Sequence, residues 1–184
     1  MWSCDPLRPL CTHQDLDRAA RAIAGALQTA GFAGRRALVL SGNGALKLAT
    51  LCGCVYAGVV AIAVPPRHDV PLTLARLAPA ASLLLGSEAS LQALQFQMPL
   101  ELAPACLDWL AVDMVMPGFA AAWRPGGVEA GALAMLECTD PWAEPACMLP
   151  VTLAELSADA GVLLRAVESP PPREPAGDVP HYVI

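Results

Sequence analysis

Between Thr12 and Gly31, apolar residues recur at every third or fourth position and polar residues fill the positions between them. This spacing predicts an amphipathic helix. Thr12 is suited to cap its first turn, Asp15 complements the positive end of the helix dipole, and Gly31 ends the helix. The apolar run 37–40 follows between two glycine-containing turns, which predicts a short buried strand.

The long uncharged segment 48–64 raises a choice between a membrane helix and a buried helix followed by a strand. A membrane-spanning helix needs about 20 apolar residues. This segment is shorter, contains Gly53 and Gly58, and ends in β-branched residues, which favour a strand. We therefore predict a buried helix over 45–56 and a strand over 59–64 that is covered on both faces. A membrane-associated protein is kept as an alternative.

The same alternation of helix and strand patterns continues along the chain. The further predicted elements are helices within 70–80, around 87–97 and over 151–167, and strands at 82–85, 111–114 and 132–137. Because the strands alternate with helices and are continuously apolar, we predict an α/β fold with a mostly parallel sheet and helices on both faces. We expect one domain over 12–167, an N-terminal arm at 1–11 and a proline-rich C-terminal tail at 168–184.

The charge balance and the cysteine pattern exclude several classes of function. The 184 residues include 17 acidic and 11 basic side chains, and the formal charge of -6 argues against nucleic-acid binding. Seven scattered cysteines without a C-x-x-C pair indicate reduced, buried thiols, and the three histidines have no partner at metal-ligand spacing. We therefore expect no metal site. Acids and prolines interrupt the apolar core that a signal peptide would need, so we expect a cytoplasmic protein.

Three short sequence motifs lie in and around the uncharged segment. They are GRRALVL at 34–40, GCVYAG at 53–58 and PPR at 65–67. This order resembles the beginning of the fatty acyl-AMP ligases, which belong to the adenylate-forming (acyl-CoA synthetase-like) superfamily and show G-D-R-V, G-C-x-Y-A-G and P-P-R words. The resemblance covers about 12–167 and implies a partial N-terminal subdomain of the adenylate-forming fold. The family activity that it implies is ATP-dependent fatty acyl adenylation, in lipid, polyketide or nonribosomal-peptide metabolism.

The resemblance fails at the family's phosphate loop. That loop is rich in glycine and serine and carries a lysine, so that its backbone N–H groups can wrap the ATP phosphates. The corresponding segment is 138–148, where Thr139 matches but the glycines, the serines and the lysine are absent. Pro141 and Pro145 have no N–H to donate, and the two acidic residues of the segment repel phosphate. We therefore expect this degenerate loop not to hold a triphosphate.

No family catalytic role can be carried over to a residue of this sequence, so we predict no catalytic, cofactor-binding or metal-ligating residue. The leading interpretation is a truncated, non-catalytic scaffold or interaction module. The alternative is a fragment of a split fatty acyl-AMP ligase, which would use ATP and Mg²⁺ only when a separately encoded partner chain completes it. Because an incomplete sheet exposes an edge, we expect a homo-oligomer or a protein partner that covers it.

A few residues have both a functional and a structural interpretation. The turn 41–44 precedes a helix and is a candidate anion site, or a turn with only a structural role. The segment 65–68 follows a predicted parallel strand, where α/β folds place ligands, or is a rigid turn. Cys52 and Cys54 are interpreted as core residues rather than reactive thiols. Trp142, in the degenerate loop, either fills the place of a nucleotide or contacts a partner.

Overall fold

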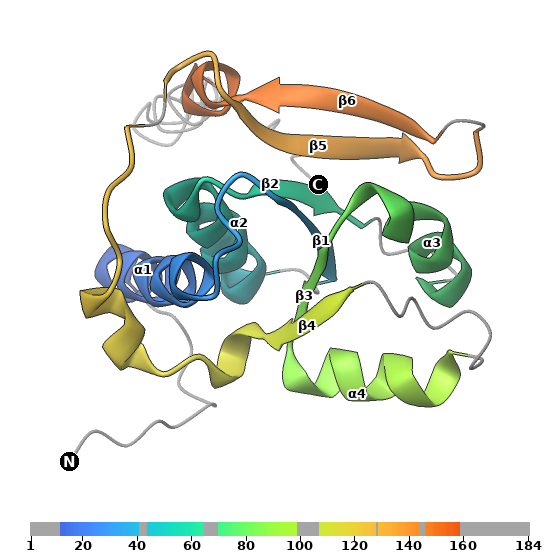
Figure 1. Cartoon of the computed structure of the whole chain (residues 1–184), viewed down its shortest axis with the longest axis horizontal. Helices are drawn as coiled ribbons and strands as arrows, with labels where there is room; N and C mark the ends of the chain where they lie inside the picture. The colour runs from blue at the N-terminus through green and yellow to red at the C-terminus, as the bar shows by residue number, and fades with distance from the viewer. Residues whose placement is uncertain are drawn as a thin grey trace, which may run out of the picture.

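The computed structural model describes residues 12–40, 44–64, 70–98, 107–127, 129–143 and 146–158 (Figure 1). Its helices are α1 (His13–Thr29), α2 (Ala45–Ala57), α3 (Val70–Leu77) and α4 (Glu88–Gln97), with short 3-10 helices η1 (Ala78–Ala80), η3 (Val112–Met114) and η4 (Pro117–Ala121). Its strands are β1 (Arg36–Leu40), β2 (Val60–Ala63), β3 (Leu83–Gly86), β4 (Asp108–Ala111), β5 (Leu133–Asp140) and β6 (Cys147–Thr152). The elements therefore alternate between helix and strand over most of the described chain, as the sequence predicts.

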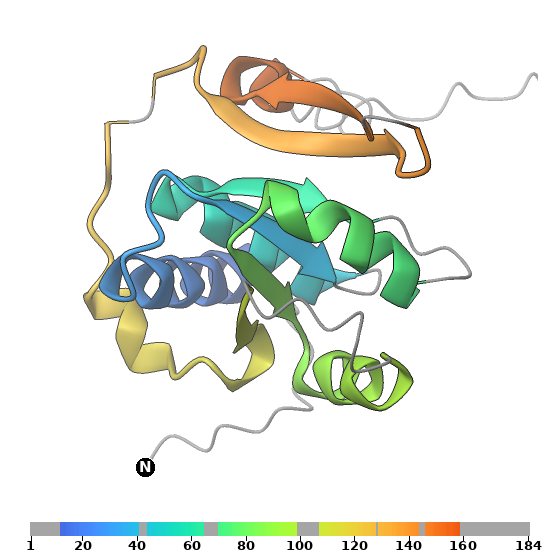
Figure 2. The same cartoon turned by 45° about the vertical axis from the view of Figure 1, so that its right-hand side comes forward.

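The strands form one six-stranded sheet in the order β4-β3-β1-β2-β5-β6. All neighbouring strands run parallel except β5 and β6, which form an antiparallel hairpin at one side of the sheet. Helices lie on both faces, with α1 and α2 on one and α3 and α4 on the other (Figure 2). The predicted α/β class and the mostly parallel sheet are confirmed.

Both faces of the central strands are buried, which explains why these strands are continuously apolar. On β1, Ala37 and Val39 face the cluster beneath α1 and α2, whereas Leu38 faces the cluster beneath α3 and α4. Neighbouring β3 follows the same alternation, with Leu84 on the second side. A strand with only one buried face would instead alternate apolar and polar residues. The central strands therefore lie in the hydrophobic core, between its two clusters.

The uncharged segment forms helix α2 and strand β2, as predicted. Helix α2 ends at Gly58, whose φ of +70° is left-handed and favours glycine. It packs closely on α1 at Gly53, where a Cβ atom would lie 2.8 Å from the Cγ2 atom of Ile23. In the described part of the chain, no helix has the length and apolar character needed to cross a membrane.

One predicted strand is displaced along the chain. The strand expected at 111–114 is β4, which begins at Asp108 and is over at Ala111, and the next three residues form η3. Pairing decides this boundary, because β4 aligns with β3 from Leu83 opposite Asp108 onward. The chain then turns, and an Asp113 carboxylate oxygen accepts the Glu88 N–H at 2.8 Å, at the start of α4.

The predicted helix over 151–167 is wrong at its beginning. Val151 and Thr152 belong to strand β6, and the helical residues begin at 153 and are described as far as 158. The Thr152 N–H donates to Glu155 Oε2 at 2.7 Å, and the Glu155 N–H donates to Thr152 Oγ1 at 3.3 Å. This reciprocal pair is a capping box, which marks the true start of the helix. The remainder of the predicted helix, the N-terminal arm 1–11 and the tail 168–184 lie outside the described residues.

Candidate functional site at the β5–β6 hairpin

The degenerate loop of the sequence analysis lies at the tip of the β5–β6 hairpin. Strand β5 ends at Asp140, the turn is described at 141–143, and β6 begins at Cys147. Since β5 runs parallel to β2, this tip lies at the carboxyl edge of the parallel strands. That edge is where α/β folds place their ligands. The hairpin tip is therefore the place at which to look for ligand-binding groups.

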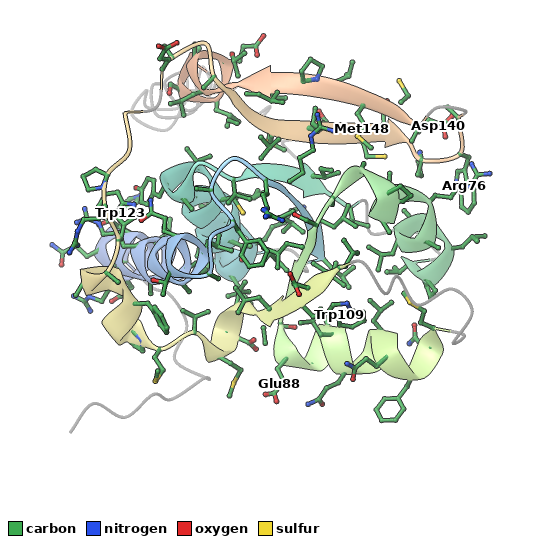
Figure 3. All side chains as sticks on the ribbon, in the orientation of Figure 1. Arg76, Glu88, Trp109, Trp123, Asp140 and Met148 are labelled. Atoms are coloured by element: carbon green, nitrogen blue, oxygen red, sulfur yellow. The ribbon has the colours of Figure 1, made fainter. Side chains whose placement is uncertain are left out.

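The backbone of the turn is held by contacts within the protein. Asp140 Oδ1 accepts the Trp142 N–H at 2.8 Å, and Arg76 Nη1 of α3 donates to the Trp142 carbonyl oxygen at 3.0 Å. The guanidinium carbon of Arg76 also lies 5.2 Å from the centre of the Trp142 ring, a cation–π distance. Figure 3 shows Arg76 and Asp140 together at the hairpin tip, beside α3. The turn is thus tied to α3 by Arg76, an arrangement that we call the Arg76 clasp.

Trp142 packs under the guanidinium of Arg76 while 47% of its surface stays exposed. It is therefore not a buried plug. Its possible role as a contact for a partner stays a prediction.

Thr139 is the residue of this segment that matches the family loop, and its hydroxyl is used within the hairpin. Thr139 Oγ1 donates to the carbonyl oxygen of Cys147 at 3.3 Å, across the base of the turn. The neighbouring Cys138 side chain is buried against the α3–α4 side of the sheet. Burial raises the pKa of the Cys138 thiol, and the nearby Asp140 carboxylate raises it further. The Thr139 hydroxyl is therefore used within the hairpin and the Cys138 thiol is buried and protonated, so neither group is available to bind a phosphate.

Of the two cysteines of α2, Cys54 is a core residue, as predicted, whereas Cys52 lies outside the core cluster. Cys54 is fully buried, and burial raises the pKa of its thiol to about 12. Cys52 is half-buried, and its pKa is raised by burial and by the carboxylate of Asp17. Because the thiolate is the reactive form of cysteine, both thiols are poor nucleophiles at neutral pH.

A second polar cluster joins α1, α2 and the segment after η4. Asp17 accepts the Tyr56 hydroxyl at 3.1 Å and pairs with Arg21 at 2.9 Å, and the Arg21 guanidinium carbon lies 5.0 Å from the centre of the Trp123 ring. Burial and the Asp17 hydrogen bond raise the pKa of Tyr56. The side chain of Gln28 donates to and accepts from the backbone of residue 124, at 2.9 Å in each direction. Each of these polar groups has its partner within the protein, so the cluster is a structural clamp.

The remaining sequence candidates are only partly described. Gly44 lies at the amino end of α2 with a φ of +114°, whereas 41–43 and the whole of 65–68 lie outside the described residues. Within the described ranges, no group of three or more His, Cys, Asp or Glu side chains could hold a metal ion. The Arg76 clasp and the Gln28 contact were not predicted. Both join residues far apart in the sequence, and no local pattern signals them.

Comparisons with known proteins agree with the resemblance found in the sequence. No family model matches the chain. The chain is 32% identical, over 139 residues, to the medium-chain-fatty-acid–[acyl-carrier-protein] ligase JamA of Moorena producens (strain JHB), a match that covers 70% of this chain and 23% of the relative. The structure superposes with a TM-score of 0.70 and 20% identity on the fatty acyl-adenylate ligase from L. pneumophila, solved in complex with acyl adenylate and pyrophosphate, covering 84% of this chain and 27% of that one.

A fatty acyl CoA synthetase of Mycobacterium tuberculosis is also similar, with a TM-score of 0.61 and 18% identity over 84% of this chain and 31% of that one. The fold is thus that of part of an adenylate-forming domain, and the resemblance stated from the sequence is confirmed. The chain spans about a quarter of the length of JamA and of the L. pneumophila ligase.

Proposed function

We propose that this chain is a non-catalytic, acyl-AMP-ligase-like domain that serves as a scaffold or interaction module in fatty-acid, polyketide or nonribosomal-peptide metabolism. The observation that carries the proposal is the chemistry of the β5–β6 hairpin tip. It combines the carboxylate of Asp140 with two prolines and contains neither glycine nor lysine. A tip of this kind does not stabilise the charge of a triphosphate.

The hydrogen bonds of the tip support the same conclusion. The Trp142 N–H, which could point at an anion, is already bonded to Asp140. Thr139 directs its hydroxyl to a backbone carbonyl. A phosphate group would have to break these bonds and then meet the Asp140 carboxylate. The retained core and the altered tip together favour a protein that keeps the fold for a purpose other than adenylation.

The outer side of the hairpin supports an interaction role. Strand β6 is the last strand of the sheet order, and β5 is its sole strand neighbour in the described structure. Leu149 on β6 is 52% exposed and Leu133 on β5 is 36% exposed. Apolar side chains beside an open strand edge are suited to contact another protein surface. We propose that a second copy of the chain or a protein partner covers this side.

The test has a binding part and an assembly part. Titration calorimetry with Mg·ATP, and an ATP–pyrophosphate exchange assay with medium- and long-chain fatty acids, are expected to give no saturable heat and no exchange. Exchange by the chain alone would overturn the proposal. Exchange only after addition of a separately encoded remainder would favour the split-ligase alternative. Light scattering checks assembly, and a monomer at all concentrations would contradict self-association.

A cytoplasmic location and the absence of a bound cofactor remain predictions from the sequence. Fractionation of the expressing cells, with a carbonate wash of the membrane pellet, tests the first. Retention in the washed pellet would support the membrane-associated alternative instead.

A further inference from the structure

The β5–β6 hairpin turns apolar side chains toward the side of the sheet that carries α1 and α2. Met135 of β5 lies opposite Ala61 of β2, and Ala61 belongs to the core cluster on that side, against which Met135 also packs. Paired residues of neighbouring strands point to the same face of a sheet. Val151 of β6 lies opposite Met135, and Leu149, two residues before it in β6, points the same way. Met135, Val151 and Leu149 therefore share one face of the hairpin.

Helix α2 lies beside this face of the hairpin. In Figures 1 and 2, α2 lies between the hairpin and α1. Its α1 flank is marked by Gly53, where a Cβ atom would lie 2.8 Å from the Cγ2 atom of Ile23. Since an α-helix turns about 100° per residue, Leu51 and Leu48 lie about 160° and about 140° around the helix from Gly53. Both leucines are therefore on the flank away from α1, and Leu51 packs against the same cluster as Met135.

The apolar side chains of the hairpin and of this α2 flank form a surface that we call the hairpin–α2 face, namely Leu48, Leu51, Met135, Leu149 and Val151. Leu48 is 50% exposed and Leu149 is 52% exposed, and the other three side chains are half-buried. A single exposed leucine is ordinary, but two of them beside half-buried apolar neighbours make a patch. Another apolar surface that covers this patch would remove it from water, which is favourable.

Two charged side chains border the hairpin–α2 face. Glu137 of β5 lies opposite Leu149, and Lys47 precedes Leu48 on α2. Neither charge forms an ion pair within the described residues. In a two-fold symmetric contact both copies present the same surface, so Lys47 of each copy can meet the partner's Glu137. A face with one charge of each sign is complementary to itself, whereas a face with a single sign would repel a second copy.

The backbone edge of β6 is poorly suited to pair with a further strand. Pro150 has no N–H to donate. The Thr152 N–H already donates to Glu155 Oε2 at 2.7 Å. Two of the six residues of β6 are thus unable to donate a backbone hydrogen bond to a new strand. We therefore expect a partner to bind the side-chain face rather than the backbone edge.

We propose that the hairpin–α2 face is the contact surface of a symmetric dimer of this chain. Leu48 and Leu149 form its apolar centre, and Lys47 of each copy pairs with the partner's Glu137. The inference rests on the interaction role proposed above, and it names a second copy of the chain as the partner.

The first test is size-exclusion chromatography with light scattering, on the full chain over a range of concentrations. The wild type should form a dimer. Lys47→Glu and Glu137→Lys each bring like charges together across the contact, so each should raise the dissociation constant of the dimer about tenfold or more. The two substitutions combined restore opposite charges and should restore the dimer. Arg35→Glu is the matched control, because it reverses an exposed positive charge before β1 and should leave the dissociation constant unchanged.

Three outcomes of this test overturn the proposal. The first is a wild type that stays a monomer at every concentration. The second is a dimer that both single reversals leave intact, since a different surface would then hold it. The third is a dimer that each reversal weakens and the combined variant fails to restore. Circular dichroism of every variant checks that a lost dimer is not a lost fold.

The second test is hydroxyl-radical labelling of the wild type, read by mass spectrometry at the side chains of Leu48 and Leu149. Labelling of both should fall as the concentration rises through the dimer transition. Phe96 of α4 is 91% exposed and lies outside the proposed contact, so its labelling should stay constant. Low labelling of the two leucines at every concentration would show that another part of the same chain covers the face. Constant high labelling would show that the face stays open, and either result overturns the proposal.

The ATP–pyrophosphate exchange assay separates this inference from the proposed function. A monomer without exchange activity refutes the dimer and leaves the non-catalytic assignment intact. A dimer that responds to the charge reversals and also catalyses exchange refutes that assignment and leaves the contact surface intact.

Discussion

Helix α1 packs against η4, and the variant Gly25→Ala tests this contact. Gly25 is buried on α1, and a Cβ atom added there would overlap the carbonyl oxygen of Phe119. It would also lie 3.1 Å from the backbone nitrogen of Trp123. Because both obstacles are backbone atoms, no side-chain rotation can relieve the overlap. The substitution should push η4 and the segment after it away from α1.

The expected loss follows from two opposing effects. Alanine is favoured over glycine inside a helix by about 1 kcal/mol. Extra atoms forced into filled space cost about 1–3 kcal/mol, and the rigid backbone obstacle places this case at the upper end. The net loss of unfolding free energy is then about 1–2 kcal/mol, which for a chain of this size lowers the melting temperature by about 2–8 °C.

The assay is urea denaturation followed by circular dichroism, with hydrogen exchange of the Arg124 amide as a local readout. That N–H donates to Gln28 Oε1 at 2.9 Å and should exchange faster in Gly25→Ala. Gly118→Ala is the matched control, since a Cβ atom there would meet nothing within 4 Å. The control should change stability by less than about 0.5 kcal/mol. Equal stability and equal exchange in the two variants would refute the packing argument.

Three further predictions concern the hairpin, a cap and a buried thiol. Arg76→Gln removes the Arg76 clasp, so it should shift the indole NMR signal of Trp142 and lower the free energy of unfolding by about 0.5–1 kcal/mol. An unchanged indole signal would contradict the clasp. The Thr152 N–H and then the Thr152 hydroxyl donate to the Glu155 carboxylate and lower its pKa. Thr152→Ala removes the hydroxyl but keeps the N–H, so an NMR titration should show the pKa of Glu155 raised only part of the way to its ordinary value; an unchanged pKa would refute the contact from the hydroxyl. Burial raises the pKa of Cys54 to about 12 from 9.0, so the unfolded chain releases this proton first and stability should fall as pH rises between these values. Cys54→Ala should reduce that slope in urea denaturation at several pH values, and an identical slope would count against the assignment.

The sequence predicts most elements of this fold because their signals are local. Thr12 caps α1 as expected, with its hydroxyl accepting the Asp15 N–H at 3.1 Å. Gly58 ends α2 in the left-handed region. The β-branched run after it becomes a buried strand. Each of these features depends on residues a few positions apart, so spacing and residue type suffice.

The errors arise where distant partners decide the structure. Strand β4 is placed by its pairing with β3, and β6 by its antiparallel pairing with β5. The residues after 150 have a helical spacing of apolar positions, which concealed the strand. Pro150 lies within β6, and proline suits an edge strand because a missing N–H costs least there.

The candidate sites also combine features that local sequence reveals with features that depend on contacts between distant residues. The altered composition of the hairpin tip is visible in the sequence, since a lost lysine and added prolines need no structure to be seen. The Arg76 clasp joins residues 66 positions apart, which become neighbours only in the folded structure. Contacts of this kind cannot be predicted from local sequence patterns.

The measurement that most directly tests the central claim is an amide NMR titration of the full chain with Mg·ATP, observed at the hairpin tip. The account predicts that the backbone amides of Thr139 and Trp142 keep their positions at millimolar nucleotide, because the Trp142 N–H is bonded to Asp140 and the Thr139 hydroxyl to Cys147. Saturable shifts at Thr139 and Trp142 would show that the hairpin binds the nucleotide and would contradict a non-catalytic role.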